Sequence, residues 1–440
     1  MIVEFRIRSN RRLRNSVRAS SSPCWSRAYS PQPEILTYMD GVADRHDLRR
    51  HIRCNSKVAA ARWNDECGLW HIELATGEVL DFEVVVAAQG MFNDLNWPAI
   101  EGMDSFKGTL FHSGDWPHDL DLNGKRVGII GSAASAVQMV PEIAKEADRV
   151  DVFQRSPNWV LPKDDPIFTE EEKAAREGRP LETREMRLKL YREMDGFCSW
   201  TELSEETREE FRQLCLQNLE AVQDPETRAK LTPDVPWGAT RPLFSNDFYP
   251  AFNRNNVGLL TDGISKITSN GIVDGNGVEH EYDVIICATG YKTDRYASAI
   301  SIIGRGGHDL GEAWKEGATA YLGITTANFP NLFMIYGPNT NNGSILFMLE
   351  CQAAYIARHV QWMDANDISW IEVKPEVEDR YNEELQAAID QVGAWKSRDN
   401  YYHAASGRNV TQYPFNMTVY RELTMTPDWD NFRFQYGVAL

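Results

Sequence analysis

The sequence predicts an α/β protein built on parallel sheets, and three observations carry that prediction. Apolar stretches of strand length alternate with segments of helical periodicity along most of the chain. One of these stretches, Lys125–Ile130, runs directly into Gly131 and then into a helical pattern, as in doubly wound sheets. A segment near the middle, residues 166–232, has helical periodicity only, which indicates a helical insertion.

The first elements follow from local patterns. Ile35, Leu36 and Met39 recur at helical spacing and predict a helix over Gln32–Ile52. Strand-like stretches separated by turn-forming residues come next, at Lys57–Arg62, Leu69–Leu74 and Val79–Ala88. After Gly131 we expect a helix to about Ala147 and then a strand over Val150–Phe153.

The insertion opens with Thr169-x-x-Glu172, a capping box that predicts a helix start. Farther along it, one apolar stripe is interpreted as core, formed by Phe211, Leu214, Cys215, Leu219 and Val222. The remaining predicted elements are strands at Val257–Leu260, Val284–Ala288 and Leu332–Ile335, and a helix from about Ile345 to Met363.

Length, charge and cysteine content narrow the function classes. A chain of 440 residues is long enough for two or three domains. The net charge of −18 argues against nucleic acid or an anionic membrane as the main partner, and no apolar run approaches the ~20 residues of a membrane span. The seven cysteines contain no CxxC pair, which disfavours a disulfide framework or a zinc site. We therefore expect a cytoplasmic protein without a metal.

Residues 1–30 differ from the rest of the chain. They hold seven arginines and many serines, with Glu4 as the only acid, and they lack the apolar core of a secretory signal. This composition suits an organelle presequence, which would make the protein organellar. It also suits a mis-started gene model whose first residues are foreign to the fold.

The turn after Lys125–Ile130 is the first candidate site. A buried strand that ends in a tight glycine turn before a helix directs backbone N–H groups outward, toward a pyrophosphate. Gly131 supplies that turn, Ala136 fills the third position of the glycine fingerprint, and Ala133 stands where a glycine is usual. The predicted cofactor-binding residues here are Gly131, Ser132, Ala133, Ser135 and Ala136. The alternative is a turn that only packs the strand against the helix.

The end of the next strand indicates which nucleotide binds. NAD-specific proteins place an acid there, whereas this strand ends in Gln154-Arg155-Ser156. A guanidinium and a hydroxyl suit a 2′-phosphate, so these three residues predict NADP(H). Asp151 lies inside the strand and is interpreted as structural. The alternative is that Arg155 is only a solvated surface arginine.

The most specific pattern is Phe106-x-Gly108-x-x-x-His112-x-x-x-Trp116-Pro117. It would arise by chance in fewer than about one in ten thousand chains of this composition. It resembles the fingerprint of Baeyer–Villiger monooxygenases, and related flavin-containing monooxygenases usually lack the tryptophan. The resemblance implies a segment that links two nucleotide domains and takes part in NADPH binding, with His112 as a hinge residue. The alternative is that His112 is a satisfied core histidine.

Further segments extend the resemblance. Within Trp237-Gly238-Ala239-Thr240-Arg241-Pro242, the resemblance implies that Arg241 lies over the flavin, orients the nicotinamide and stabilises the anionic peroxyflavin. Thr240 takes the place of a lysine that often contacts the 2′-phosphate. The strand–turn signature at Asp283–Tyr291 adds Ala288, Thr289 and Gly290, with Gly90 as a weaker first copy. Gly337-Pro338-Asn339-Thr340-Asn341 resembles the flavin-side loop, which adds Asn339 and Thr340.

The resemblance covers about Trp25 to Phe434. Members of the family begin with a strand, GxGxxG and helix that hold FAD, and no such unit precedes Trp25. We therefore expect two Rossmann-like domains, the FAD one incomplete, and favour an incomplete gene model. The expected division is a foreign segment (1–30), FAD domain (31–118), NADP domain (119–165), helical insertion (166–235), NADP domain (236–293) and FAD domain (294–440).

The activity implied is that of an FAD- and NADPH-dependent monooxygenase. It would insert one oxygen atom of O2 into a ketone, or oxidise a soft nitrogen or sulfur nucleophile, with a small organic molecule as substrate. The alternative is a non-catalytic NADP(H)-binding remnant of such an enzyme. A disulfide reductase of similar architecture would need a redox cysteine pair, which the chain does not contain.

Overall fold

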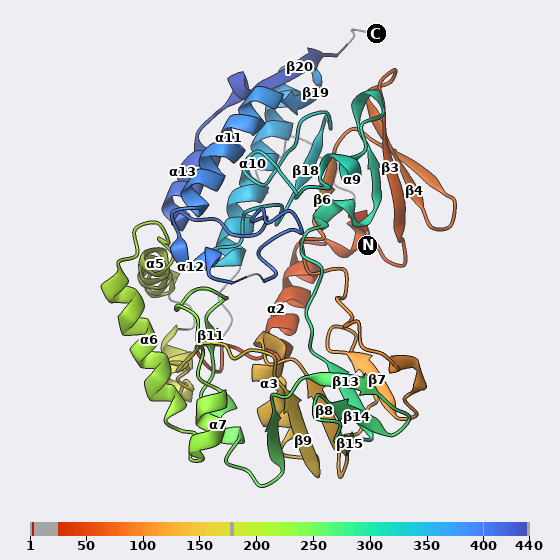
Figure 1. Cartoon of the computed structure of the whole chain (residues 1–440). Coiled ribbons are helices and arrows are strands. Elements are labelled where there is room, and N and C mark those ends of the chain that lie inside the picture. Colours follow the sequence, from red (N-terminus) through yellow and green to blue (C-terminus); the bar gives the residue numbers. More distant parts are fainter. Residues whose placement is uncertain (1, 4–24, 177–179, 399, 438–440) are drawn as a thin grey trace.

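The computed structural model describes residues 2–3, 25–176, 180–398 and 400–437. Most of the arginine-rich segment predicted at 1–30 therefore lies outside the described residues. The described chain forms two lobes, seen one above the other in Figure 1, with the helical insertion along one side.

The lower lobe is organised by a five-stranded parallel sheet. Its strand order is β12 (Val257–Leu260), β9 (Arg149–Phe153), β8 (Arg126–Ile130), β16 (Val284–Cys287) and β7 (Thr109–His112). The central strands are apolar on both sides because the sheet is covered on both faces. Four of the five were predicted. β7, which lies inside the fingerprint, was not predicted as a strand.

Different layers cover the two faces of this sheet. Helices α3 (Ala134–Ile143), α6 (Glu205–Leu219) and α8 (Phe248–Ala251) contribute to the core on one face. The other face packs against an antiparallel sheet of β13 (Ile264–Ile267), β14 (Gly271–Asp274) and β15 (Glu279–Glu281). The helix predicted after Gly131, α3, was expected to reach about Ala147. It ends at Ile143, and the Asn256 amide donates to the carbonyls of Ala144 and Ala147 at 3.1 and 2.8 Å.

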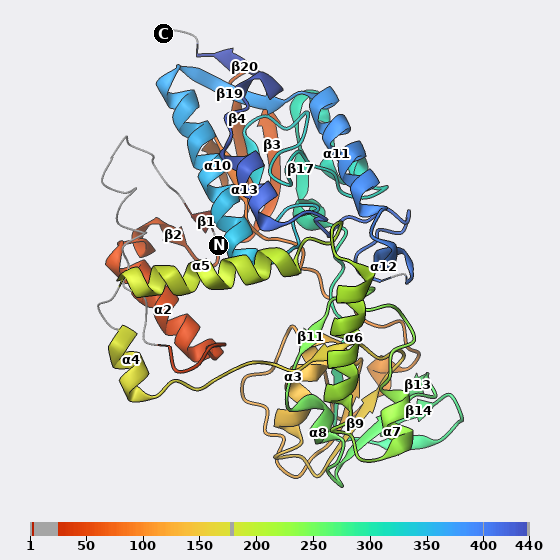
Figure 2. The same cartoon turned by 90° about the vertical axis from the view of Figure 1, so that its left-hand side faces the viewer.

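The helical insertion is confirmed, with α4 (Glu170–Arg176), α5 (Pro180–Phe197), α6 and α7 (Pro225–Lys230) (Figure 2). Its capping box is present, because the Thr169 N–H donates to Glu172 Oε2 at 2.8 Å and the Glu172 N–H donates to Thr169 Oγ1 at 3.2 Å. The predicted apolar stripe is narrower than expected, since Leu214 is 42% exposed while Leu219 is buried.

The upper lobe holds the sheet β17 (Ser301–Ile303), β3 (Val58–Asn64), β4 (Leu69–Leu74) and β5 (Val79–Phe82). The prediction of one strand over Val79–Ala88 was wrong, because the chain changes sheet after Phe82. The Asn331 amide donates to the Glu83 carbonyl at 2.8 Å, and β6 (Val85–Ala87) then pairs in parallel with β18 (Leu332–Met334).

The C-terminal elements complete this lobe. Helix α10 (Ile345–Ala365) confirms the helix predicted from Ile345. Beyond it, the sequence patterns did not identify α11 (Pro375–Ile389), α12 (Gly393–Lys396), α13 (Met417–Met425) or the antiparallel pair β19 (Ile368–Val373) and β20 (Phe432–Tyr436). Within the described ranges, no helix is long and apolar enough to cross a membrane.

The first predicted helix is also shorter than expected. This helix, α2 (Gln32–Arg45), ends at Arg45, because His46 caps it and Asp47 takes a left-handed conformation with φ +52°. The residues up to Ile52 form a 3-10 turn and the start of β2 (Ile52–Arg53). The apolar face of α2 remains largely open to solvent, with Ile35 46% and Met39 59% exposed.

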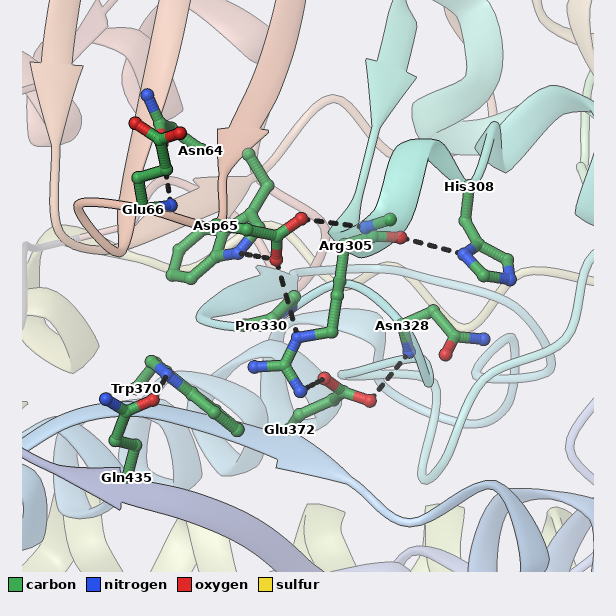
Figure 3. Close-up of polar contacts among 12 residues, drawn as sticks. Asn64, Asp65, Glu66, Arg305, His308, Asn328, Pro330, Trp370, Glu372 and Gln435 are labelled. Atoms are coloured by element: carbon green, nitrogen blue, oxygen red, sulfur yellow. Dashed lines mark hydrogen bonds and ion pairs between the residues drawn. The ribbon is translucent and has the colours of Figure 1, made fainter.

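An ionic network ties the sheet of the upper lobe to the C-terminal strands (Figure 3). Arg305 pairs with Glu372 of β19 at 3.1 Å and with Asp65, which follows β3, at 3.7 Å. The guanidinium also stacks on Trp370, 3.8 Å from the ring centroid. The Glu372 carboxylate has no exposed surface and also accepts from Arg433 of β20 at 2.5 Å. The network therefore joins four segments that are far apart in the sequence.

Candidate active site

Gly131 forms the turn between β8 and α3. Its φ of +112° lies in the region that favours glycine, and a Cβ at this position would lie 2.5 Å from the Ala288 carbonyl oxygen at the end of β16. Ala133 caps α3 without a side-chain hydrogen bond, so the first N–H groups of the helix have no side-chain cap. Ala136 is fully buried beneath the turn, and Ser135 is exposed at the helix start. This turn has the conformation that a pyrophosphate site needs.

The three residues after β9 have different surroundings. Gln154 is buried and its amide donates to the Lys230 carbonyl at 2.7 Å, so its side chain is turned toward the end of α7. Arg155 is exposed, and Ser156 is half-buried. Of the three predicted residues, Ser156 contacts the turn after β8, through its carbonyl and the Ser132 hydroxyl, and Arg155 has its side chain exposed to solvent. Asp151 is buried and accepts from the Tyr282 hydroxyl at 3.0 Å, in keeping with a structural role.

Hydrogen bonds connect the predicted residues of the two nucleotide motifs. The Ser132 hydroxyl donates to the Ser156 carbonyl at 3.0 Å, and the Asn158 amide donates to the Ser132 carbonyl at 3.3 Å. The Thr240 hydroxyl donates to Asn158 Oδ1 at 3.2 Å. The structure thus brings Ser132, Ser156 and Thr240 together, with Asn158 as a bridge that no sequence pattern identified.

Arg241, directly after Thr240, is exposed and forms no ion pair with the described residues. Its guanidinium lies near the phenols of Tyr336 and Tyr401. Burial raises the pKa of both tyrosines, and the positive charge of Arg241 opposes that shift. Both phenols are therefore neutral beside a permanent cation.

An aromatic cluster adjoins Arg241, and the sequence analysis did not identify it. The Phe92 ring lies 5.4 Å from the Tyr291 ring and 6.4 Å from each of the Tyr336 and Tyr401 rings, between centroids. Gly90 permits this packing, because a Cβ there would lie 2.9 Å from Cδ1 of Tyr336. The one signal for the cluster was the family-like glycine at position 90.

The fingerprint segment contains β7, which ends beside the contact between the loop of Asn96 and the loop of Thr289. His112 ends β7 with no exposed surface, and its Nδ1 accepts from the Gly114 N–H at 3.0 Å. Burial lowers the pKa of His112, while the Gly290 backbone and Asp115 oppose that shift. Its ring packs 5.5 Å from Trp97, next to the loop in which Asn96 and Thr289 are joined.

The two loops pair directly. The Thr289 hydroxyl donates to the Asn96 carbonyl at 2.6 Å, and the Asn96 N–H donates to the Gly290 carbonyl at 3.0 Å. These bonds lie where the chain passes between the lobes. The paired loops therefore connect the two lobes next to His112. This position suits the hinge role expected for this histidine.

The other fingerprint residues shape the start and end of β7. A Cβ on Gly108 would lie 2.4 Å from the Asp283 carbonyl oxygen and 2.6 Å from Cζ of Phe106, so this position needs glycine for space. Trp116 packs edge-on against Phe111, with the centroids 5.0 Å apart, and Pro117 is half-buried beside it. These residues fix the path of the chain around β7.

The loop predicted to face the flavin is held by its own side chains. Asn339 is buried and its amide donates to the carbonyls of Asn409 and Gln412, each at 3.0 Å. The Thr340 hydroxyl donates to the Gly337 carbonyl at 2.7 Å. Asn339 Oδ1 is buried without a hydrogen-bond partner, so one acceptor of this loop remains free. Apart from that acceptor, both side chains are occupied by the protein itself.

The described residues fit the two cofactors unequally. For NADP(H) they offer the turn at Gly131, the open start of α3 and the exposed Arg155. For FAD they offer the loop at Asn339 and the start of α10, where Ser344 caps the helix by accepting from the Phe347 N–H at 3.4 Å. The described ranges contain no second glycine turn that leads straight from a parallel strand into a long helix.

Comparisons with known proteins agree with this geometry. The family model of flavin-binding monooxygenase-like proteins matches residues 26–166. A Baeyer–Villiger monooxygenase of Pseudomonas aeruginosa is 38% identical over 411 residues, which cover 92% of this chain and 78% of that protein. Among solved structures, cyclohexanone monooxygenase from Rhodococcus sp. Phi1 bound to NADP+ superposes with a TM-score of 0.84 at 29% identity, over 94% of this chain and 86% of that one. OTEMO in complex with FAD and NADP gives 0.83 at 28% identity, over 93% and 86%.

Proposed function

The chain belongs to the family of Baeyer–Villiger monooxygenases, and we propose that this member inserts one oxygen atom from O2 into a small ketone at the expense of NADPH. In balance, the ketone, O2, NADPH and one proton give an ester or lactone, NADP+ and water. The observation that carries the proposal is the position of Arg241. This cation, which pairs with no acid in the part of the chain that the structure describes, follows the NADP-side residue Thr240 and lies beside the phenols of Tyr336 and Tyr401.

NADP(H) binding uses the lower lobe. The start of α3 and the turn at Gly131 would hold the pyrophosphate, and Arg155 with Ser156 would hold the 2′-phosphate. We retain the predicted division of the NADP domain into 119–165 and 236–293, with 166–235 inserted, and the FAD domain over 31–118 and 294–440. Four strands of the parallel sheet come from 119–165 and 236–293, which supports this division. The fifth, the edge strand β7, comes from the range assigned to the FAD domain.

FAD, when bound, supplies the transfer of electrons from NADPH to O2. The part that falls to the protein is electrostatic. Arg241 keeps its charge at any working pH and would stabilise negative charge that develops on oxygen in the site. Tyr336 and Tyr401 stay neutral because burial raises the pKa of each phenol, so they do not neutralise Arg241.

His112 has a different part. It has no exposed surface, and the lowered pKa keeps the ring neutral at pH 7. Its packing against Trp97 and its position next to the loop of Gly290 place it where the lobes are joined. We therefore assign it to the relative movement of the lobes, and no proton transfer is required of it.

The experiment begins with the visible absorption spectrum of the purified chain, with and without added FAD. A flavin spectrum, followed by NADPH oxidation with cyclic ketones under 18O2, should give lactones that carry one 18O atom. The same assay with an amine or a sulfide in place of the ketone tests the nitrogen and sulfur alternative.

Two results would contradict the proposal. NADP+ binding with no flavin spectrum, even after FAD is added, would favour the non-catalytic remnant. Lactone that carries no 18O would show that O2 is not the oxygen donor.

A further inference from the structure

A side chain from the C-terminal part of the chain reaches the end of β9. The Arg398 guanidinium donates through Nη2 to the hydroxyl of Ser156, which lies 242 residues away in sequence. Arg398 follows α12 and is half-buried. In Figures 1 and 2, α12 lies at the level where the two lobes meet. The upper lobe therefore contributes a cation to the predicted nucleotide site of the lower one.

The charges at this point are not balanced by the protein. Among the residues that the structure describes, neither Arg155 nor Arg398 forms an ion pair. Asp151, the one acid within β9, is buried and already paired with Arg149 at 2.7 Å. Arg398 contacts Ser156, and Arg155 precedes Ser156 in sequence, so two arginines without an ion-pair partner among the described residues belong to the end of β9. In a chain with 64 acidic and 46 basic residues, this excess of positive charge at one place favours an anion.

The anion that this position fits is a phosphate on the adenosine ribose. The end of the second strand of a nucleotide-binding sheet faces the ribose 2′ position. A phosphate dianion is a much stronger acceptor for a guanidinium than the neutral hydroxyl of Ser156. Resting on the proposed function, we infer that Arg398 joins Arg155 in binding the 2′-phosphate of NADP(H). Arg398 then supplies the second positive charge, in place of the lysine that often stands at the position of Thr240.

The segment around Arg398 is anchored on both sides. Before it, Trp395 is 1% exposed, with its ring 5.3 Å from that of Trp200. After it, the Asn400 amide donates to the Ala239 carbonyl at 2.9 Å, and Asn400 Oδ1 accepts from the Tyr402 N–H at 2.8 Å. The guanidinium is therefore held in place before the nucleotide arrives, which reduces the entropy cost of binding.

The test measures equilibrium binding of NADP+ and NAD+ by isothermal titration, without reference to turnover. Wild type should prefer NADP+. R398A should weaken NADP+ about tenfold or more and change NAD+ less than about twofold, because only NADP+ carries the 2′-phosphate. R398K should lose less, since it keeps the charge. R192A, which removes an exposed arginine of α5, is the matched control and should change neither affinity.

A second substitution tests whether R398A weakens NADP+ binding through the lost positive charge or through lost packing. In R398A, the added substitution T240K places a cation at the residue that Asn158 and Ser132 connect to Ser156 by hydrogen bonds, and it should recover much of the NADP+ affinity. Equal weakening of NADP+ and NAD+ in R398A, or unchanged NADP+ affinity, would overturn the assignment of Arg398. Wild-type protein that binds neither nucleotide, or does not prefer NADP+, would instead overturn the proposed NADPH dependence.

Discussion

The backbone of Gly131 lies so close to Ala288 that a Cβ on Gly131 would be 2.5 Å from the Ala288 carbonyl oxygen. The contact joins the turn after β8 to the end of β16, which are neighbouring strands in the parallel sheet. Two motifs that are separate in the sequence therefore form one surface. The nucleotide turn keeps its shape only if residue 131 has no side chain.

Gly131→Ala is expected to lower the free energy of unfolding by about 3 kcal/mol, from left-handed strain and a backbone overlap together. It should also abolish measurable NADP+ binding. Gly124→Ala is the matched control, because Gly124 also has positive φ, +65°, but a Cβ there meets nothing within 4 Å. It should cost about 1 kcal/mol and leave NADP+ affinity intact. Urea unfolding with nucleotide titration measures both, and similar losses in the two variants would contradict the role of the Ala288 contact.

Arg241→Ala should retain NADP+ affinity within about threefold and lower oxygenated product at least 100-fold, because the cation acts on charge that develops during the reaction. NADPH oxidation should continue, with hydrogen peroxide in place of lactone. Product analysis by gas chromatography beside a peroxide assay measures this separation. Arg241→Lys keeps a charge and should retain part of the product. Undiminished product in Arg241→Ala would refute the role given to this residue.

His112 makes stability depend on pH in a predictable direction. Burial lowers its pKa in the folded state below the unfolded value of about 6.5, so the unfolded chain binds the extra proton more readily. The contribution of His112 to the free energy of unfolding is thus fully present above pH 6.5. It falls as the pH drops toward the lowered pKa that His112 has in the folded state. Between pH 7 and pH 5, His112→Asn should lose less stability than wild type in urea unfolding. Parallel curves for the two proteins would show that His112 does not titrate as described.

The buried carboxylate of Glu372 predicts a contrast with a surface pair. Glu372→Ala leaves Arg305 and Arg433 without their shared partner, so we expect a loss of about 3 kcal/mol in unfolding free energy. Glu350→Ala, which removes an exposed pair with Arg187, should change stability by less than about 1 kcal/mol. Thermal and urea unfolding compare the two. A small effect at Glu372 would mean that the network in Figure 3 contributes little to joining its four segments.

Local chemistry predicted the elements whose causes are local. The strand that leads into Gly131, the capping box at Thr169 and the helix that begins at Ile345 each lie at the expected positions. The break within Val79–Ala88 could not be predicted, because its cause is Asn331, far along the chain.

The site shows the same division between local and distant causes. Ser132, Ser156 and Thr240 come together as their motifs suggest. Asn158 and Arg398 belong to no motif, and only the packing of the lobes brings Arg398 to Ser156. The inward turn of the Asn339 side chain likewise depends on partners about 70 residues away.

The contact between Arg398 and Ser156 at the end of β9 has a consequence for the redesign of cofactor preference. To change the specificity from NADP(H) to NAD(H), the usual substitution replaces Arg155 with an acid that binds the ribose hydroxyls. Here that new carboxylate would stand next to Ser156, which Arg398 contacts, so Arg398 would compete with the ribose hydroxyls for it. We therefore expect a change of coenzyme to need edits at two places about 240 residues apart.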